Sequence, residues 1–187
     1  MTAISPIESE RLIIREFQEN DWRALHLYGS DPEVMSGLLL LPNTEERSRE
    51  VVDEFISYQL EEPRTRYELA MTLASTGELI GGSGIRMVSP GNKEASMGYV
   101  LRRESWGNGY ATEGARVVLR IGFEMLNAHR VFATVDTENA GSIGVLEKLG
   151  MTREGTLRQS FWSPFHQSWR DVHYYAILEE EWRSASN

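Results

Sequence analysis

Hydrophobic residues along this chain follow two different spacings, and the order of these spacings predicts a mixed α/β (α+β) fold. Short apolar or alternating runs predict strands at about residues 12–17, 67–73, 79–87, 95–101, 131–135, 153–162 and 168–178. Apolar residues three and four apart predict helices at about residues 21–29, 44–59, 111–125 and 142–149. The sequence therefore predicts a sheet of about seven strands with about four helices.

Turn and cap signals set the ends of several of these elements. Ser75–Gly77 and Pro90–Asn92 separate three consecutive strands, which we expect to pair as antiparallel neighbours. Pro63 stops the second predicted helix, and Gly150 follows the fourth as a left-handed cap. No Pro/Gly/Ser-rich linker or internal repeat divides the chain, so we expect one domain over residues 1–187.

A glycine-rich turn, Trp106-Gly-Asn-Gly-Tyr-Ala-Thr-Glu113, joins a predicted strand to a predicted helix. Gly107 and Gly109 can take positive φ without the steric penalty of a Cβ atom, so successive N–H groups can point into one concavity. Ala111 and Thr112 open a helix whose first amides are unpaired and whose dipole is positive at that end. The turn therefore predicts a site for a phosphate or pyrophosphate group.

Two common phosphate-binding loops do not fit this turn. A Walker loop ends in Gly-Lys-Ser/Thr, whereas Tyr110, Ala111 and Thr112 follow Gly109 here. A dinucleotide fingerprint needs a third glycine three residues after Gly109, and Thr112 stands at that position. Taken alone, a Gly-x-Gly turn also serves as a tight connection between a strand and a helix, so the neighbouring residues must decide.

The turn fits most of the pattern Gln/Arg-x-x-Gly-x-Gly/Ala, with Gly109 and Ala111 in the required places and Trp106 at the one position that departs. Other motifs follow it or span the rest of the chain: Glu10–Arg15, Ser30–Met35, Thr76–Gly81, Gly98–Tyr99, Asp136–Ser142, Val145–Met151 and Trp169–Tyr175. Together they resemble the acetyl-CoA-binding core of the GCN5-related N-acetyltransferase (GNAT) superfamily. Within it, the chain is similar to the RimJ/RimL-type ribosomal-protein N-terminal acetyltransferases.

The resemblance implies a GNAT fold, with a central mixed, mostly antiparallel sheet whose fourth and fifth strands splay apart around the thioester. It implies that the backbone of Tyr99 and Leu101 binds the pantetheine arm like an added strand, although both are equally ordinary as strand residues. It also implies that the turn binds the pyrophosphate of acetyl-CoA, through Trp106, Gly107, Asn108, Gly109, Tyr110, Ala111 and Thr112.

Asn139 and Ser142 match the Asn-x-x-Ser motif of the family at the start of a helix. The resemblance implies that Asn139 bonds a pantetheine amide and that the Ser142 hydroxyl protonates the departing thiolate. The alternative is a structural one, because Asn and Ser are also common helix caps.

The residue that removes a proton from the acceptor amine is hard to name from the sequence. RimL-type relatives tend to carry a glutamate after the Arg/Lys-Gln pair of the sixth strand, but Ser160 follows Arg158-Gln159 here. The position on the fourth strand where other relatives place an acid is Ser96. The remaining candidates for catalytic roles are Glu94, Glu138 and Tyr174, each of which is equally an ordinary surface carboxylate or core tyrosine.

Two further stretches are candidates for the wall of an acceptor pocket. Leu38–Leu41, before Pro42, is either an apolar lid or a packed helix end. His166 lies in the aromatic loop Phe161–Trp169 and is either a pocket residue or a polar surface group.

Composition narrows the function classes. Nineteen basic against 28 acidic side chains give a net charge of −9, which disfavours nucleic-acid binding and is compatible with a cationic acceptor. With no cysteine there is no disulfide and no cysteine nucleophile, and the four histidines show no metal-ligand spacing, so no metal is expected. The longest apolar run, Leu38–Leu41, is far too short to span a bilayer, and we expect a cytoplasmic protein with no membrane partner.

The resulting hypothesis is an acetyl-CoA-dependent N-acetyltransferase. It would move an acetyl group to a primary amine, either a protein N-terminus or a small molecule, by direct attack in a ternary complex. The alternative is a CoA-binding sensor or scaffold without activity. We expect a monomer or a homodimer.

Overall fold

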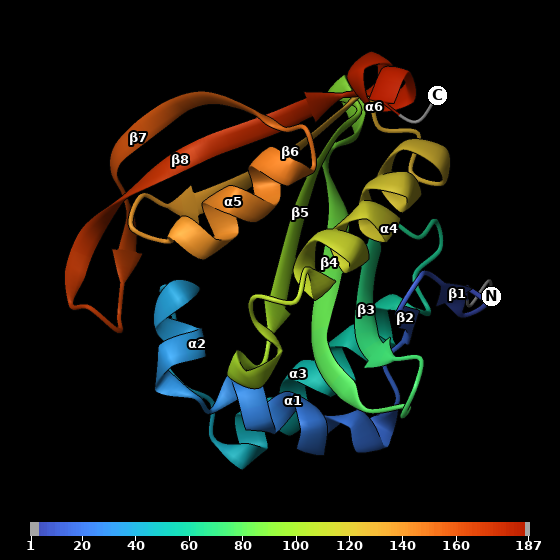
Figure 1. Ribbon diagram of the computed structural model, residues 1–187, viewed down its shortest axis with the longest axis vertical. Coiled ribbons are helices and arrows are strands. Elements are labelled where there is room, and N and C mark those ends of the chain that lie inside the picture. Colours follow the sequence, from blue (N-terminus) through green and yellow to red (C-terminus); the bar gives the residue numbers. More distant parts are fainter. Residues whose placement is uncertain (1–3, 186–187) are drawn as a thin grey trace.

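The computed structural model describes residues 4–185, and within them eight strands form one sheet. The strands are β1 (Ile7–Glu8), β2 (Leu12–Glu16), β3 (Arg66–Leu73), β4 (Leu79–Ser89), β5 (Glu94–Leu101), β6 (Arg130–Asp136), β7 (Thr152–Ser163) and β8 (Ser168–Leu178). Their order across the sheet is β1-β2-β3-β4-β5-β6-β8-β7 (Figure 1). All neighbours are antiparallel except β5 and β6, which are parallel.

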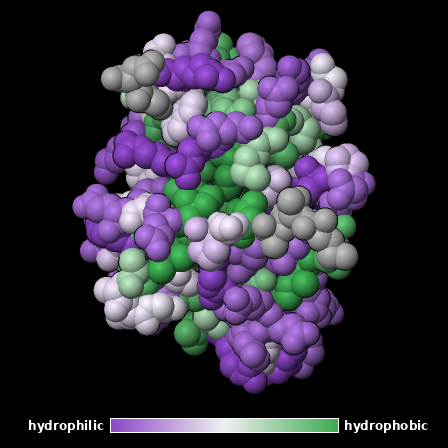
Figure 2. All heavy atoms as spheres, turned by 90° about the vertical axis from the view of Figure 1, so that its right-hand side faces the viewer, coloured by the Kyte–Doolittle hydropathy of each residue, from purple (hydrophilic) through white to green (hydrophobic). Residues whose placement is uncertain are grey.

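Helices cover both faces of this sheet. Over residues 4–185 they are α1 (Trp22–Gly29), α2 (Pro32–Gly37), α3 (Glu45–Tyr58), α4 (Tyr110–Glu124), α5 (Ala140–Lys148) and α6 (Glu179–Ala185), with short 3₁₀ turns at Glu19–Asp21, Pro90–Asn92 and Arg103–Ser105. No helix in this part of the chain combines the length and apolar content needed to cross a membrane. The side of the molecule at the right of Figure 1 is mostly hydrophilic, with a smaller hydrophobic area near its centre (Figure 2).

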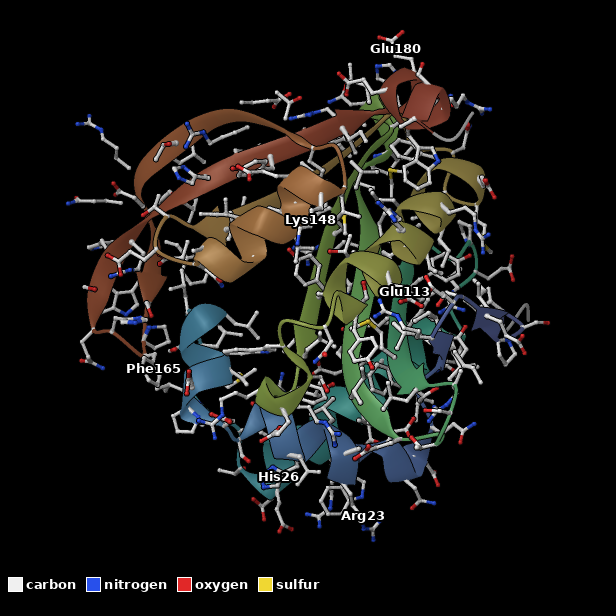
Figure 3. All side chains as sticks on the ribbon, viewed as in Figure 1. Arg23, His26, Glu113, Lys148, Phe165 and Glu180 are labelled. Carbon is white, nitrogen blue, oxygen red and sulfur yellow. The ribbon has the colours of Figure 1, made fainter. Side chains whose placement is uncertain are left out.

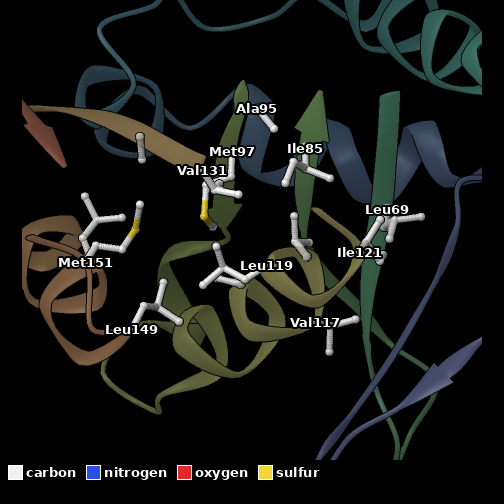
Figure 4. Close-up of a cluster of buried hydrophobic side chains, with 14 of the residues drawn as sticks. Leu69, Ile85, Ala95, Met97, Val117, Leu119, Ile121, Val131, Leu149 and Met151 are labelled. Carbon is white, nitrogen blue, oxygen red and sulfur yellow. The ribbon is translucent and has the colours of Figure 1, made fainter. Parts of the chain in front are cut away.

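Alternation along β3 divides the hydrophobic core between the two faces. Leu69 and Met71 join the larger cluster, in which Leu119, Ile121 and other residues of α4 pack on the sheet (Figure 4). Ala70 points to the opposite face and joins a smaller cluster with residues of α1 and α3. The sheet is therefore fixed from both sides, with α4 on one face and α1 and α3 on the other.

The parallel pair β5 and β6 is joined over a short distance only. Glu94, Ala95 and Ser96 pair with Arg130, Val131 and Phe132, and no pairing follows along the rest of β5. Beyond Ser96 the two strands diverge, as Figure 1 shows, and the free edge of β5 faces a gap. The sequence analysis did not predict β1, so its fourth and fifth strands are β5 and β6 of the structure. The predicted splay between these two strands is confirmed.

The seven predicted strands and four predicted helices are all present, and the sequence interpretation missed three elements. Strand β1 has two residues, which is too short to show a period. Helix α2 has only six residues, and the one feature of the sequence that marks its start is the N-cap residue Asp31 followed by Pro32. In the structure the Asp31 side chain accepts a hydrogen bond from the Glu33 amide. Helix α6 follows β8 without an intervening turn.

Candidate active site

The glycine-rich turn has the backbone that its sequence predicts. Gly107 and Gly109 have φ of 76° and 81°, in the left-handed region, and Gly109 is the N-cap of α4. The helix begins at Tyr110, one residue earlier than predicted. Its first amides have no partner within the helix, so they are free to bind an anion.

Side chains fix this turn from both ends. The indole Nε1 of Trp106 donates a 2.9 Å hydrogen bond to the carbonyl of Leu101, and Asn108 Nδ2 donates to the carbonyl of Trp106 at 3.0 Å. Trp106 thus ties the turn to the end of β5, which gives a structural reason for a tryptophan where the family pattern has a polar residue.

Arg11, in the connection between β1 and β2, supports the turn, and the sequence alone assigned it no role of its own. Its Nη1 donates to the Asn108 carbonyl at 2.8 Å, and its guanidinium lies over the Tyr110 ring at 4.9 Å and pairs with Glu113 at 2.8 Å. Burial raises the pKa of Glu113, but hydrogen bonds from the Arg11 amide, Ser9 and the Arg11 guanidinium outweigh it and lower the pKa overall. Glu113 is therefore a fixed carboxylate on α4 (Figure 3) that anchors Arg11 beside the turn.

The gap between β5 and β6 holds a cavity of about 940 Å³. We call it the splay cavity. It is bounded by β5, β6, the turn and the first residues of α4 and α5. It brings together most of the predicted site residues: Tyr99, Leu101, Trp106, Gly107, Gly109, Tyr110, Ala111, Thr112, Glu138, Asn139 and Ser142. His166 also lines it, and its Nδ1 lies 3.0 Å from Ser163 Oγ.

Two hydroxyl groups meet in this cavity. The Tyr99 hydroxyl lies 2.8 Å from Ser142 Oγ and donates to the Ser142 carbonyl at 3.1 Å. Burial raises the pKa of Tyr99 to about 12, although the hydrogen bond with Ser142 opposes the shift. Tyr99 therefore stays protonated at neutral pH, and its side chain links β5 to the start of α5.

Asn139 caps α5. Its Oδ1 accepts a hydrogen bond from the Ser142 amide at 3.0 Å, and its Nδ2 donates to the Gly37 carbonyl at 3.1 Å. The cap interpretation is thus realised, and the side chain also ties α2 to α5 at the cavity wall. An amide group has two donors and two acceptor positions, so one of each remains for a ligand.

Glu138 lies on the cavity wall in an ion-pair cluster. Arg170 pairs with Glu138 at 2.6 Å and with the buried Asp136 at 2.8 Å. Burial raises the pKa of Asp136, but the hydrogen bond from Arg170 is among the contacts that lower it overall. The Glu138 side chain is 76% exposed and already holds a guanidinium, and its catalytic role stays a prediction.

Three predicted residues lie outside the lining of the splay cavity. The Asn108 side chain is turned back toward the turn itself. Glu94 accepts a hydrogen bond from Arg130 at 2.9 Å where β5 and β6 are still paired. Tyr174 stacks on Phe132 with the ring centres 4.7 Å apart. The geometry does not bring Glu94 or Tyr174 to the gap, and their catalytic roles stay predictions.

A second cavity, of about 620 Å³, lies on the α1 and α3 face of the sheet, and we call it the α1–α3 cavity. Leu38, Leu40 and Leu41 line it, while Leu39 is buried. Leu38 and Leu39 also line the splay cavity, and a role of this stretch at an acceptor pocket stays a prediction. Gly98, Tyr99 and Val100 line both cavities. The two cavities therefore meet at the free edge of β5.

Comparison with known proteins identifies the family. The family model described as "Acetyltransferase (GNAT) domain" matches residues 11–152. The chain belongs to the GNAT acetyltransferase family. It is therefore an acyl-CoA N-acyltransferase, as its motifs predict.

Relatives of this GNAT protein cover almost its whole length. It is 35% identical to the uncharacterized N-acetyltransferase YnaD of Bacillus subtilis (strain 168), over 94% of this chain and 98% of YnaD. The crystal structure of a GNAT-family acetyltransferase from Bacillus anthracis is 34% identical, with a TM-score of 0.82 over 94% of this chain and 99% of that one. The ribosomal L7/L12 α-N-protein acetyltransferase RimL shares the fold, with a TM-score of 0.77 and 22% identity over 91% of each chain. The predicted resemblance to the GNAT superfamily is thereby confirmed, and RimL is among its structural neighbours.

Members of this family use acetyl-CoA, and the site fits that molecule. Positive φ at both glycines and the open start of α4 suit a pyrophosphate, and the unpaired edge of β5 suits an amide-containing arm. When bound, acetyl-CoA supplies a thioester carbonyl as acyl donor. Among residues 4–185, no group of three or more His, Asp or Glu side chains is arranged to hold a metal ion; that no metal takes part stays a prediction.

Proposed function

We propose that this GNAT enzyme transfers an acetyl group from acetyl-CoA to a primary amine by direct attack in a ternary complex. The observation that carries the proposal is that two cavities, on different sides of β5, share Gly98, Tyr99 and Val100 of that strand, together with Leu38. The donor would occupy the splay cavity and the acceptor the α1–α3 cavity. Both substrates can then be present together, so no acyl-enzyme is needed.

The reaction balances with the groups at hand. The neutral amine forms a bond from its nitrogen to the acetyl carbon, the bond from that carbon to sulfur breaks, and the nitrogen loses a proton as the amide forms. The Ser142 hydroxyl would give a proton to the thiolate and regain, through water, the proton that the nitrogen loses, while Tyr99 stays protonated as its hydrogen-bond partner. Asn139 would position Ser142 by capping its helix.

The acceptor is a protein N-terminal amine or a small-molecule amine. RimL, which shares the fold, acts by its description on the α-amine of ribosomal L7/L12, and the same class is therefore part of the proposal for this chain. The net charge of −9 suits a cationic acceptor of either kind. Monomeric or homodimeric state and cytoplasmic location stay predictions.

Measurement of free thiol released from acetyl-CoA tests the proposal. The panel holds simple primary amines, polyamines and peptides with free N-termini, each paired with its N-acetylated form as a control. Amine-dependent thiol release, with acetylamine detected by mass spectrometry, is the expected result. Tight CoA binding without release on any acceptor would instead favour a sensor or scaffold. Initial rates that intersect when both substrates are varied are expected for a ternary complex, and parallel lines would exclude it.

A further inference from the structure

Glu68 lies in an unusual place for a carboxylate. It is on β3 and faces the α1–α3 cavity, where it is the one acidic side chain among the lining residues of the described chain. In the sheet it pairs with Gly84 of β4, and Gly84 pairs with Gly98 of β5. Residues directly opposite each other point to the same face, so Glu68 begins a cross-strand row whose next two members have no side chain.

The glycines leave a path from Glu68 to the edge of β5. A Cβ atom on Gly84 would lie 2.0 Å from Glu68 Oε2, so the carboxylate rests directly over the Gly84 backbone. A Cβ atom on Gly98 would meet nothing within 4 Å, so the space above Gly98 is open. Adjacent strands are about 4.8 Å apart, which puts the carboxylate roughly one strand spacing from Gly98. Gly98 itself lies two residues beyond Ser96, where the pairing with β6 ends.

Most of the side chains that line the cavity with this carboxylate are apolar or aromatic. Phe17, Leu25 and Phe55 line the cavity with it. No side chain of residues 4–185 is seen donating a hydrogen bond to Glu68, and burial raises its pKa to about 7 although Arg66 and Arg86 oppose the shift. A carboxylate in such surroundings has unused capacity to bind a cation, and its proton affinity suits acid–base work near neutral pH.

We propose that Glu68 binds the ammonium group of the acceptor in the α1–α3 cavity and accepts its proton before the nitrogen attacks. This inference rests on the proposed function and names the proton acceptor for it. The R–NH₃⁺ group transfers one proton to the Glu68 carboxylate, directly or through one water molecule. The products are R–NH₂, with its lone pair free for attack over Gly98, and a neutral Glu68 carboxyl group.

The same cavity indicates the class of acceptor. With Glu68 as its single acidic lining residue, it suits one ammonium group joined to an apolar or aromatic body. A polyamine would place further ammonium groups against apolar walls, which is costly. An arylalkylamine and a peptide with an apolar N-terminal residue both meet this description, and the test below separates them.

The charged and titratable groups near Glu68 come from several elements. Tyr28, on α1, is buried. Its burial raises its pKa most, the negative charges of Asp21 and Glu68 raise it further, and the phenol therefore stays neutral. Arg47, on α3, lines the cavity, but its guanidinium pairs with Glu50 and Glu54.

The strands contribute the remaining groups. Arg66 on β3 and Arg86 on β4 lower the pKa of Glu68, and the half-buried Tyr99 on β5 stays protonated. Glu68 is thus the one group among these that titrates near neutral pH.

The experiment compares the wild type with Glu68→Gln, and with Glu124→Gln as the matched control. Glu124 is exposed on α4 and lines neither cavity. Probes are 2-phenylethylamine, the peptide Met-Ala-Ala-Ala and spermidine. Calorimetry gives the affinity of each amine and of CoA, and thiol release gives the pH profile of kcat/KM. We expect Glu68→Gln to keep the CoA affinity, to weaken binding of the preferred probe at least tenfold, and to lower kcat/KM by about 10²–10⁴ with loss of the limb near pH 7.

The outcomes distinguish a failure of the role of Glu68 from a failure of the proposed acetyltransferase function. A folded Glu68→Gln protein with wild-type amine affinity and an unchanged pH profile overturns the role of Glu68 and leaves the acetyltransferase proposal intact. If the wild type turns over no amine, the proposed function fails, and a Glu68-dependent loss of amine binding would still support the ammonium site. Preference for spermidine would overturn the acceptor class, and the ratio of the other two probes tells a small amine from a peptide N-terminus.

Discussion

The hydroxyl group of Tyr99 lies 2.8 Å from Oγ of Ser142, across the gap that opens between β5 and β6. Tyr99 is on the strand whose free edge suits the pantetheine arm, and Ser142 is in the first turn of α5, where Asn139 caps the helix. The pair therefore joins the two walls of the splay cavity at one point. It also gives Ser142 a hydrogen-bond partner that stays protonated, because burial holds the pKa of Tyr99 near 12.

Removal of either hydroxyl should lower kcat more than it changes the KM for acetyl-CoA. Ser142→Ala removes the proton donor, and we expect a loss in kcat of about 10²-fold. Tyr99→Phe removes only its partner, with a loss of about tenfold. Because the two groups act as one unit, the double variant should resemble Ser142→Ala alone. Tyr58→Phe, which alters a tyrosine outside both cavities, serves as the control.

Steady-state kinetics of the four proteins completes this double-mutant cycle. Additive losses would show that Tyr99 does not act through Ser142. An unchanged kcat in Ser142→Ala would show that the Ser142 hydroxyl does not take part in the reaction, and Ser142 would then be only a structural residue in the first turn of α5.

Gly109→Val should raise the KM for acetyl-CoA by tenfold or more. Its φ of 81° is a conformation that a β-branched residue adopts only with strain, and its Cβ atom would lie 3.3 Å from Arg11 Nη2. The new side chain would also keep a pyrophosphate away from the amides. Gly91→Val is the control, since that glycine has open space around it. Unchanged affinity for CoA in Gly109→Val, measured by calorimetry, would refute the assignment of the turn.

Arg11→Ala should weaken CoA binding by about three- to tenfold while leaving kcat nearly unchanged. The guanidinium holds the Asn108 carbonyl and the Tyr110 ring, so its loss loosens the turn rather than the reacting centre. A loss of this modest size is expected for a charged contact that is open to solvent. Arg23→Ala is the control, because Arg23 lies on α1 over the Trp22 ring, away from the turn (Figure 3). Equal CoA affinity in both variants would remove Arg11 from the site.

The backbone features of the proposed donor site could be predicted from sequence because they lie within single segments. Positive φ at Gly107 and Gly109 and an N-cap at Asn139 are local properties, and each was visible as a residue type at a fixed spacing. The splay between β5 and β6 followed from the resemblance. What the sequence did not show was the partner of Ser142, since the contact with Tyr99 spans 43 positions.

The proton acceptor that we propose, Glu68, escaped prediction because its position at the cavity depends on the register of three strands. Glu68 stands in an alternating run, where a lone glutamate is usually a solvent-facing residue. Only the pairing of Glu68 with Gly84, and of Gly84 with Gly98, turns it toward an open path. A signal was present, since β4 and β5 carry glycines at positions where strands usually carry side chains that pack. Without the strand register, however, the sequence does not show that these glycines lie beside Glu68.

A carboxyl group retained in an apolar cavity should reduce stability, and this gives a test of Glu68 that needs no substrate. Burial raises its pKa from 4.5 to about 7, against the opposing charges of Arg66 and Arg86. Below pH 4.5 the group is protonated in both the folded and the unfolded chain, so it has no effect. Between pH 4.5 and 7 the unfolded chain releases the proton first, and stability falls as pH rises until the folded pKa is passed.

Glu68→Gln should therefore stabilise the protein at pH 8 and leave it nearly unchanged at pH 4.5. The amide resembles the protonated acid in size and charge, so it removes the ionisation cost. A pKa difference of this size corresponds to about 3 kcal/mol in the free energy of unfolding. Urea unfolding at several pH values measures the difference between variant and wild type, with Glu124→Gln as the control. A difference that is constant with pH would mean that Glu68 is not buried as a titrating carboxyl. A gain in stability above pH 7, together with a loss of amine binding, is expected of a group kept for its chemistry rather than for folding.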